Sequence, residues 1–121
     1  MTGTRNTLTL YPDKQPPDDK EAEIAEILNR AIEHNLCVRW TYKPSLMQAA
    51  PHILYRKNGG LYLDAVVTQY DGSIVDDDKL ASFKLTTLVS PAVTTEAFEP
   101  RMVFDPAEPR YRDGIVARAV V

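Results

Sequence analysis

The sequence predicts an α+β fold in which one amphipathic helix precedes a small antiparallel sheet of about five strands. Residues 19–35 repeat apolar side chains at helical spacing, and residues 36–97 contain short segments in which apolar and polar residues alternate. Two dipeptides between these segments, Asn58-Gly59 and Asp71-Gly72, are typical of tight hairpin turns. One helix followed by consecutive short strands favours a twisted sheet covered by that helix, and closure into a small barrel would remove the exposed sheet edges.

Composition narrows the class of protein. A length of 121 residues suggests one domain with one core, and 44% hydrophobic with 26% charged residues is typical of soluble globular proteins. The net charge of −3 gives no overall attraction to nucleic acid or anionic lipid, although it says nothing of local basic patches. No apolar run reaches the roughly 18 residues of a membrane span, and the first residues lack a signal-peptide pattern. We therefore expect a cytoplasmic protein with no membrane partner.

Residues 1–17 form the first predicted region, an extended N-terminal arm. The consecutive prolines Pro16 and Pro17 exclude a helix there, and "TLTLY" at 7–11 is either a short edge strand or part of the arm. The helix that follows begins near Asp18 or Asp19, whose side chains can accept hydrogen bonds from its free N–H groups. Asn35 is suited to its end. Its apolar stripe consists of Ile24, Ile27, Leu28, Ala31 and Ile32.

The strands are predicted from alternation and from the turns that bound them. "LCVRWTY" at 36–42 is the first, a loop is expected over 43–51, and "HILYRK" at 52–57 is the second. The segment 61–70 between the two turns is the third, and residues 80–91 contain one or two more. Helix and sheet together define a domain at 18–97. Residues 98–121 are expected to form an extended C-terminal tail whose last residues are a strand, a short helix or a segment that docks on a partner.

Signatures of catalysis are absent from the sequence. It contains no GxSxG, P-loop, GxGxxG, HExxH or CxxC motif, and only His34 and His52 could supply the base of a triad. The single cysteine, Cys37, excludes an intrachain disulfide, and its place in a strand favours a packing role. His52 is interpreted either as a structural residue bonded to a carbonyl or as a donor in a pocket. We expect a protein that is not an enzyme and that uses neither a metal nor a cofactor.

Aromatic and basic residues are interleaved in the predicted strands. The pattern includes Arg39-Trp40, Tyr55-Arg56-Lys57 and Phe83-Lys84. Aromatic faces stack on bases and cations neutralise phosphates, so such a sheet can bind a nucleotide or a short single strand. The alternative is that the rings fill the core while the charged ends remain solvated, and the spacing favours this alternative.

The order of several short motifs resembles the WYL domain family over residues 24–106. The motifs are "LNRAIEHN", "CVRWTY", "PHILYRKNGG", "LYLDAVV", "SFKLTTLVSP" and "AFEPRMVFDP". This resemblance implies a helix followed by a five-stranded SH3-like or Sm-like β-barrel. Family members usually lie behind a helix-turn-helix segment in bacterial transcription regulators, where the domain acts as a sensor of nucleic acid or nucleotide-like ligands. This chain begins too close to the predicted barrel for us to expect such a segment within it.

Matching the family motifs residue by residue gives a candidate ligand site. Tyr62 matches the motif tyrosine, Leu61 replaces the motif tryptophan, Lys84 matches the first arginine of "FRLDRI", and Thr87 replaces the second. Lysine keeps the charge but loses the planar fork of arginine, and threonine loses the charge.

These matches lead to two hypotheses. The first is a non-catalytic, stand-alone WYL-like module that senses a nucleotide or single-stranded nucleic acid and takes part in transcription regulation. Its site would comprise Tyr62, Lys84, Tyr42 and His52. The second is a protein-interaction or scaffold module that uses the barrel and the apolar end of the tail to contact a partner protein or a second copy of itself.

Overall fold

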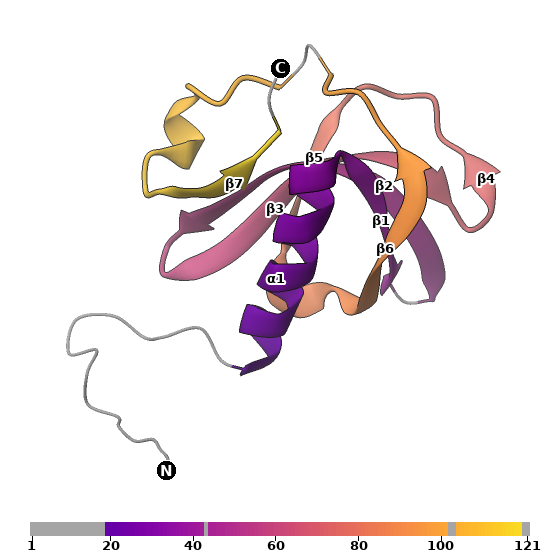
Figure 1. The fold of residues 1–121 in the computed structure, drawn as a ribbon, viewed down its shortest axis with the longest axis horizontal. Coiled ribbons are helices and arrows are strands. Elements are labelled where there is room, and N and C mark those ends of the chain that lie inside the picture. The colour runs from indigo at the N-terminus through magenta and orange to yellow at the C-terminus, as the bar shows by residue number, and fades with distance from the viewer. Residues whose placement is uncertain (1–18, 43, 102–103, 120–121) are drawn as a thin grey trace.

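In the part of the chain that the structure describes, one α-helix lies across a curled antiparallel sheet (Figure 1). The computed structural model describes residues 19–42, 44–101 and 104–119, so the predicted arm over 1–17 lies outside the described residues. The elements are, in order, α1 (Asp19–His34), β1 (Leu36–Tyr42), β2 (Ser45–Lys57), β3 (Gly60–Tyr70), β4 (Ser73–Ile74), β5 (Leu80–Lys84), the 3₁₀ turn η2 (Leu85–Thr87), β6 (Val89–Ala97), the 3₁₀ turn η3 (Pro109–Tyr111) and β7 (Ile115–Arg118).

The helix has most of the apolar stripe that the sequence predicts, although Ile27 is only half-buried. Ile24, Leu28, Ala31 and Ile32 are buried in the main core between α1 and the sheet. The helix ends because Asn35 adopts a left-handed conformation with φ of 54°, which Asn tolerates better than most residues. Its N–H donates to the Ile32 carbonyl at 3.2 Å and closes the last turn.

Both predicted hairpin turns are confirmed. Asn58 and Gly59 have φ of 50° and 80°, and Asp71 and Gly72 have φ of 53° and 87°. Two successive positive φ values are the requirement of the type I′ turn, whose twist matches that of the flanking strands. Strand β3 therefore runs between these two turns, as predicted.

The loop predicted over residues 43–51 is wrong, because β2 begins at Ser45 and continues through Pro51 to Lys57. Its first half pairs with β1 on one edge and with β3 on the other. Proline cannot donate to a ladder, but here it lies at a register shift between Pro51 and Ile53, where a missing N–H is tolerated. The proline marks a bulge inside one long strand instead of a strand boundary.

The sheet contains seven described strands where five were predicted. Its path is β4-β3-β2-β1-β6, with β5 paired to β3 and β7 paired to β2. The extra strands are short: β4 continues the β3 hairpin and β7 comes from the C-terminal segment. The sheet curls into a half-barrel, and the connection from β5 through η2 to β6 joins two strands that lie far apart in the ladder. Closure into an SH3-like or Sm-like barrel stays a prediction.

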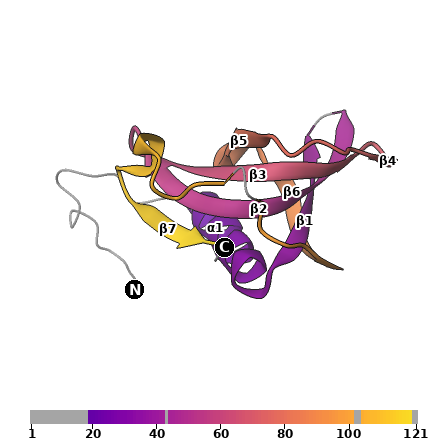
Figure 2. The same ribbon diagram turned by 90° about the horizontal axis from the view of Figure 1, so that it is seen from above.

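The two faces of the sheet are covered by different parts of the chain. The helix packs on one face (Figure 2), around Trp40, Leu54 and Leu63. The described part of residues 98–119 covers the other face with a set of buried side chains, namely Phe98, Phe104, Tyr111 and Ala119. The prediction of an extended tail is thus corrected. This segment packs on the face of the sheet opposite to α1, the outer face, because that face is itself apolar. Of the three alternatives for its end, a last strand is confirmed by β7.

None of the helices described in the structure combines the length and apolar character required to cross a membrane.

Candidate functional site

Successive side chains of β3 point to opposite faces of the sheet. Leu61 and Leu63 pack in the core beneath α1, whereas Tyr62 packs with the cluster on the outer face. Successive side chains of a strand point to opposite faces, so Asp64 lies on the same face as Tyr62. The candidate site is therefore on the outer face of the sheet.

The structure brings Tyr62 and Lys84 together. They are direct partners in the β3–β5 ladder. In the ladder on the other edge of β3, Tyr62 is opposite Tyr55 of β2. Residues directly opposite in a ladder share one face, with Cβ atoms about 4.5–5.5 Å apart. Tyr62 is half-buried with its ring 6.0 Å from that of Tyr55, while Lys84 is exposed. Both border Gly60: a Cβ placed there would lie 3.7 Å from Lys84 Cε and 3.8 Å from Tyr62 Cε1.

A second lysine reaches the same tyrosine from the opposite strand. Lys57 Nζ lies 5.8 Å from the centroid of the Tyr62 ring. This distance is within the roughly 6 Å at which a cation is attracted by an aromatic face. Lys57 follows Tyr55 by two positions in β2, which places it on the same face. Sequence reasoning included Lys57 in the basic pattern but did not assign it to the site.

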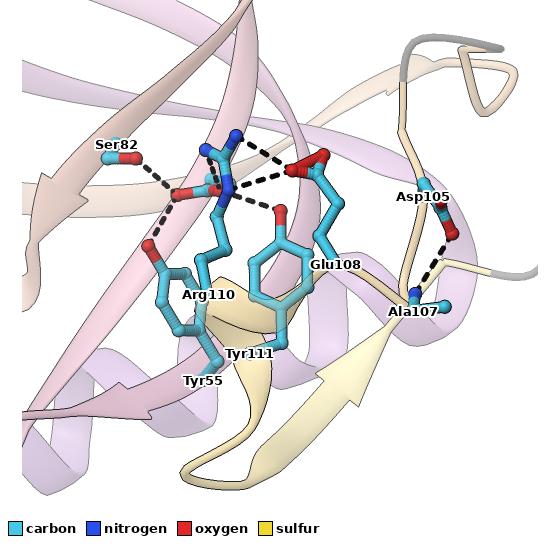
Figure 3. A network of polar contacts seen from close by, with 8 residues as sticks. Tyr55, Ser82, Asp105, Ala107, Glu108, Arg110 and Tyr111 are labelled. Carbon is cyan, nitrogen blue, oxygen red and sulfur yellow. Dashed lines mark hydrogen bonds and ion pairs between the residues drawn. The ribbon is translucent and has the colours of Figure 1, made fainter.

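Two positions after Tyr62 in β3, the carboxylate of Asp64 is fully buried and accepts four hydrogen bonds. Figure 3 labels the four donor residues, which are Tyr55, Ser82, Arg110 and Tyr111. Its Oδ1 accepts from the hydroxyls of Tyr55 at 2.8 Å and Ser82 at 2.6 Å. Its Oδ2 accepts from the Tyr111 hydroxyl at 2.7 Å and from Arg110 Nη1 at 3.4 Å. The donors come from β2, β5 and η3, so one carboxylate ties two strands to the C-terminal segment.

The surroundings of Asp64 make it an anchor instead of an accessible base. Burial raises the pKa of Tyr55 to about 12; the contact with Ser82 opposes this rise and the bond to Asp64 adds to it. Burial first, and then the bond to Asp64, also raises the pKa of Tyr111. Both hydroxyls therefore stay protonated and donate throughout the neutral range. Among the described residues no cluster of three or more His, Cys, Asp or Glu could hold a metal ion.

Sequence reasoning missed Asp64 and its partners. A signal was present, since a charged residue in the middle of "LYLDAVV" is unusual in a strand with apolar neighbours. The alternation also placed it beside Tyr62. The donors Arg110 and Tyr111, however, lie 46 and 47 residues further along the chain. No local pattern links such distant positions.

Tyr42 does not join Tyr62 and Lys84. It ends β1 with 44% of its surface exposed, and its ring lies edge-on to Phe83 at 6.0 Å. Phe83 belongs to the core beneath α1. Tyr42 is thus on the helix side of the sheet, whereas Lys84, the next residue after Phe83, points to the outer face.

His52 is fully buried beneath the C-terminal segment. Its Nδ1 is 2.9 Å from the Ala50 carbonyl, and its Nε2 accepts from the Arg101 backbone N–H at 2.9 Å. A carbonyl only accepts and an amide only donates, so the neutral ring with its proton on Nδ1 satisfies both partners. The ring also contacts Phe98 and Phe104, with centroids at 5.2 and 5.5 Å. These contacts match the structural interpretation of His52.

Comparison with known proteins gives one informative likeness. No protein-family model matches the chain, and no curated protein matches it. Its fold is similar to part of proteasome accessory factor B/C (PafBC) of Arthrobacter aurescens. The TM-score is 0.60 at 14% sequence identity, over 84% of this chain and 16% of that one. The chain thus corresponds to about one sixth of the length of PafBC, and the likeness concerns the fold.

We predict that Asp64→Asn destabilises the fold by about 2–3 kcal/mol, because the amide cannot accept from all four donors and leaves Arg110 without the buried charge. Urea denaturation followed by circular dichroism measures the change. Asp76→Asn, which makes the same replacement at an exposed position, is the matched control and should change stability by less than about 0.5 kcal/mol. Equal stability of the two variants would contradict the anchoring role.

We also predict that His52 makes stability fall in mild acid. Burial, which outweighs the bond to the Ala50 carbonyl, lowers the pKa of His52 from its ordinary 6.5. The folded state then binds fewer protons than the unfolded state, so its stabilising contribution is complete above about pH 6.5 and is lost as the pH falls towards the folded pKa. Urea denaturation of the unaltered protein and of His52→Gln across pH 5–8 measures this. His34→Gln, at an exposed histidine, should keep the full pH dependence, and a His52→Gln variant that keeps it as well would refute the assignment.

Proposed function

We propose that this chain is a non-catalytic, WYL-like sensing module that binds a nucleotide or a short single-stranded nucleic acid beside Tyr62 and Lys84. The observation that carries the proposal is the direct pairing of these two residues on the outer face of the sheet, where Tyr62 is half-buried and Lys84 is exposed. A half-buried ring held by its neighbours can stack on a base, and an adjacent ammonium group can neutralise a phosphate. Tyr42 and His52, which lie elsewhere, are not part of this proposed site.

The charges on the outer face support binding of an anion. Arg110 is paired with two carboxylates, at 3.4 Å from Asp64 and 2.9 Å from Glu108. Within the described ranges, neither Lys57 nor Lys84 forms an ion pair. Their charges are therefore available to a ligand, although the net charge of the chain is −3.

The fold likeness is a second line of support. The fold of this chain is similar to part of PafBC, and independently the order of its motifs resembles the WYL domain family. An SH3-like or Sm-like barrel is part of the proposal, because β5, η2 and β6 follow one another and β6 pairs with β1. A role in transcription regulation would require a DNA-binding partner or segment besides the described domain.

We propose no catalysis at this surface. Its one buried carboxylate, Asp64, is enclosed by four donors and has no exposed surface from which to act as a base. The exposed groups are an aromatic ring and ammonium groups that recognise ligands by stacking and charge.

The test is a titration of ¹⁵N-labelled protein with ATP and with a short oligothymidylate, followed by amide chemical shifts. We expect shifts at residues 60–63 of β3 and 82–84 of β5, and we expect Lys84→Gln to weaken binding by about threefold to fivefold, as for one exposed charge contact. Tyr42→Phe, on the opposite face, should bind normally. Absence of shifts with both ligands, or shifts confined to α1 and β1, would rule the proposal out.

A second candidate function is protein interaction through β7. In the described sheet this strand pairs with β2 alone, and its exposed residues include Ile115 and Val116, at 42% and 45% exposure. Val116 also lines a hollow of about 370 Å³ between β7 and the end of α1. A free strand edge with apolar side chains can pair with the same edge of a second copy.

This candidate predicts a concentration-dependent dimer in light scattering of the unaltered protein. Val116→Lys should leave a folded monomer, because it places a charge in the middle of the pairing edge. Ile74→Lys is the control, since Ile74 is 83% exposed on β4, a strand at a different edge of the sheet. A point substitution is used because removal of the C-terminal segment would also remove Tyr111 from the core. A monomer at all concentrations would exclude self-association through β7.

A further inference from the structure

We infer that Lys57 is the second cation of the Tyr62–Lys84 surface and makes it selective for ligands with two or more adjacent phosphate charges. The inference rests on the proposed function and concerns the ligand of the same site. Its starting point is the placement of the charges: β3 carries Tyr62 and lies between β2, which carries Lys57, and β5, which carries Lys84. The two cations therefore approach one ring from opposite neighbouring strands.

The hairpin gives Lys57 an open route to the ring. Its ladder partner is Gly60, which has no side chain to separate the lysine from Tyr62. Gly60 also lies beside the Lys84 chain, with 3.7 Å between Lys84 Cε and the site of a Cβ. Lys57 Nζ is already held over the ring at 5.8 Å. Gly60 is thus a neighbour of both lysines and of the Tyr62 ring, and it adds no side chain between them.

The position that would carry the second arginine of the family motif does not supply this charge. Thr87 ends η2, and its hydroxyl donates to the Lys84 carbonyl at 2.6 Å, so it closes the turn. This bond places the Thr87 side chain beside the backbone of Lys84. In this chain the second charge comes from the β2–β3 hairpin instead, through Lys57.

Two separated ammonium groups distinguish ligands by their charge. A nucleoside can only stack on Tyr62, and a monophosphate can place its single phosphate group beside one lysine. A diphosphate, or two successive phosphates of a single strand, can contact both lysines at once. We therefore expect affinity to rise from adenosine to AMP and again from AMP to ADP, and the second increase should depend on Lys57.

The experiment titrates ¹⁵N-labelled protein with adenosine, AMP and ADP at one low ionic strength and measures dissociation constants from amide shifts. Lys57→Gln should weaken ADP binding by about threefold to fivefold, the scale of one exposed charge contact, and should leave AMP binding much less affected. Lys57→Arg should bind as the unaltered protein does, because it keeps the charge. Lys20→Gln removes the same charge from an exposed position on α1 and is the matched control.

A gain-of-charge variant tests the same idea from the other side. Adding Thr87→Arg to Lys57→Gln should recover the preference for ADP over AMP, since it adds a second cation at a residue whose side chain lies beside the Lys84 backbone. If Lys57→Gln keeps the full preference while Lys84→Gln weakens both nucleotides, the inference fails and the proposed function stands. If the unaltered protein binds none of the three probes nor a short oligothymidylate, both are overturned.

Discussion

The fold depends on a carboxylate that is buried between the sheet and the segment that covers it. Asp64 takes hydrogen bonds from β2, from β5 and from η3, and it has no contact with solvent. An isolated buried charge would be strongly destabilising, so the four donors are a condition for folding and not an addition to it. Because two of them belong to Arg110 and Tyr111, the C-terminal segment cannot leave the sheet without leaving this charge unpaired.

The same contacts determine the chemistry of the outer face. Tyr111 packs against Tyr55 with ring centroids 4.8 Å apart, and Tyr55 in turn packs against Tyr62. The ring of the proposed site is thus supported from beneath by the residues that bind Asp64. Arg110 pairs with Asp64 and Glu108, whereas Lys57 and Lys84 form no ion pair within the described residues. A weakly acidic protein can therefore present a local site for anions.

Sequence reasoning was most successful where a structure depends on neighbouring residues. The stripe of α1 and the turns at Asn58-Gly59 and Asp71-Gly72 follow from spacing and from residues that accept positive φ. It failed at Pro51, because whether a proline ends a strand or lies at a bulge depends on the strands beside it. It failed again for the C-terminal segment, where an irregular, proline-rich sequence predicts an extended tail although its aromatic residues complete a core.

In the candidate site, too, local sequence predicts some features and only the pairing of strands decides the others. Local alternation was enough to place Tyr62 opposite to Leu61 and Leu63, and the family resemblance was enough to associate it with Lys84. The pairing of strands then separated Tyr42 from this surface, buried His52 under Phe98 and Phe104, and added Lys57 across the hairpin. The reason is physical: φ preferences and side-chain periodicity act over a few residues and are written in the chain locally. Which face is covered, and which charges are neutralised, depends on contacts between segments more than forty residues apart, such as Asp64 with Arg110 and Tyr111.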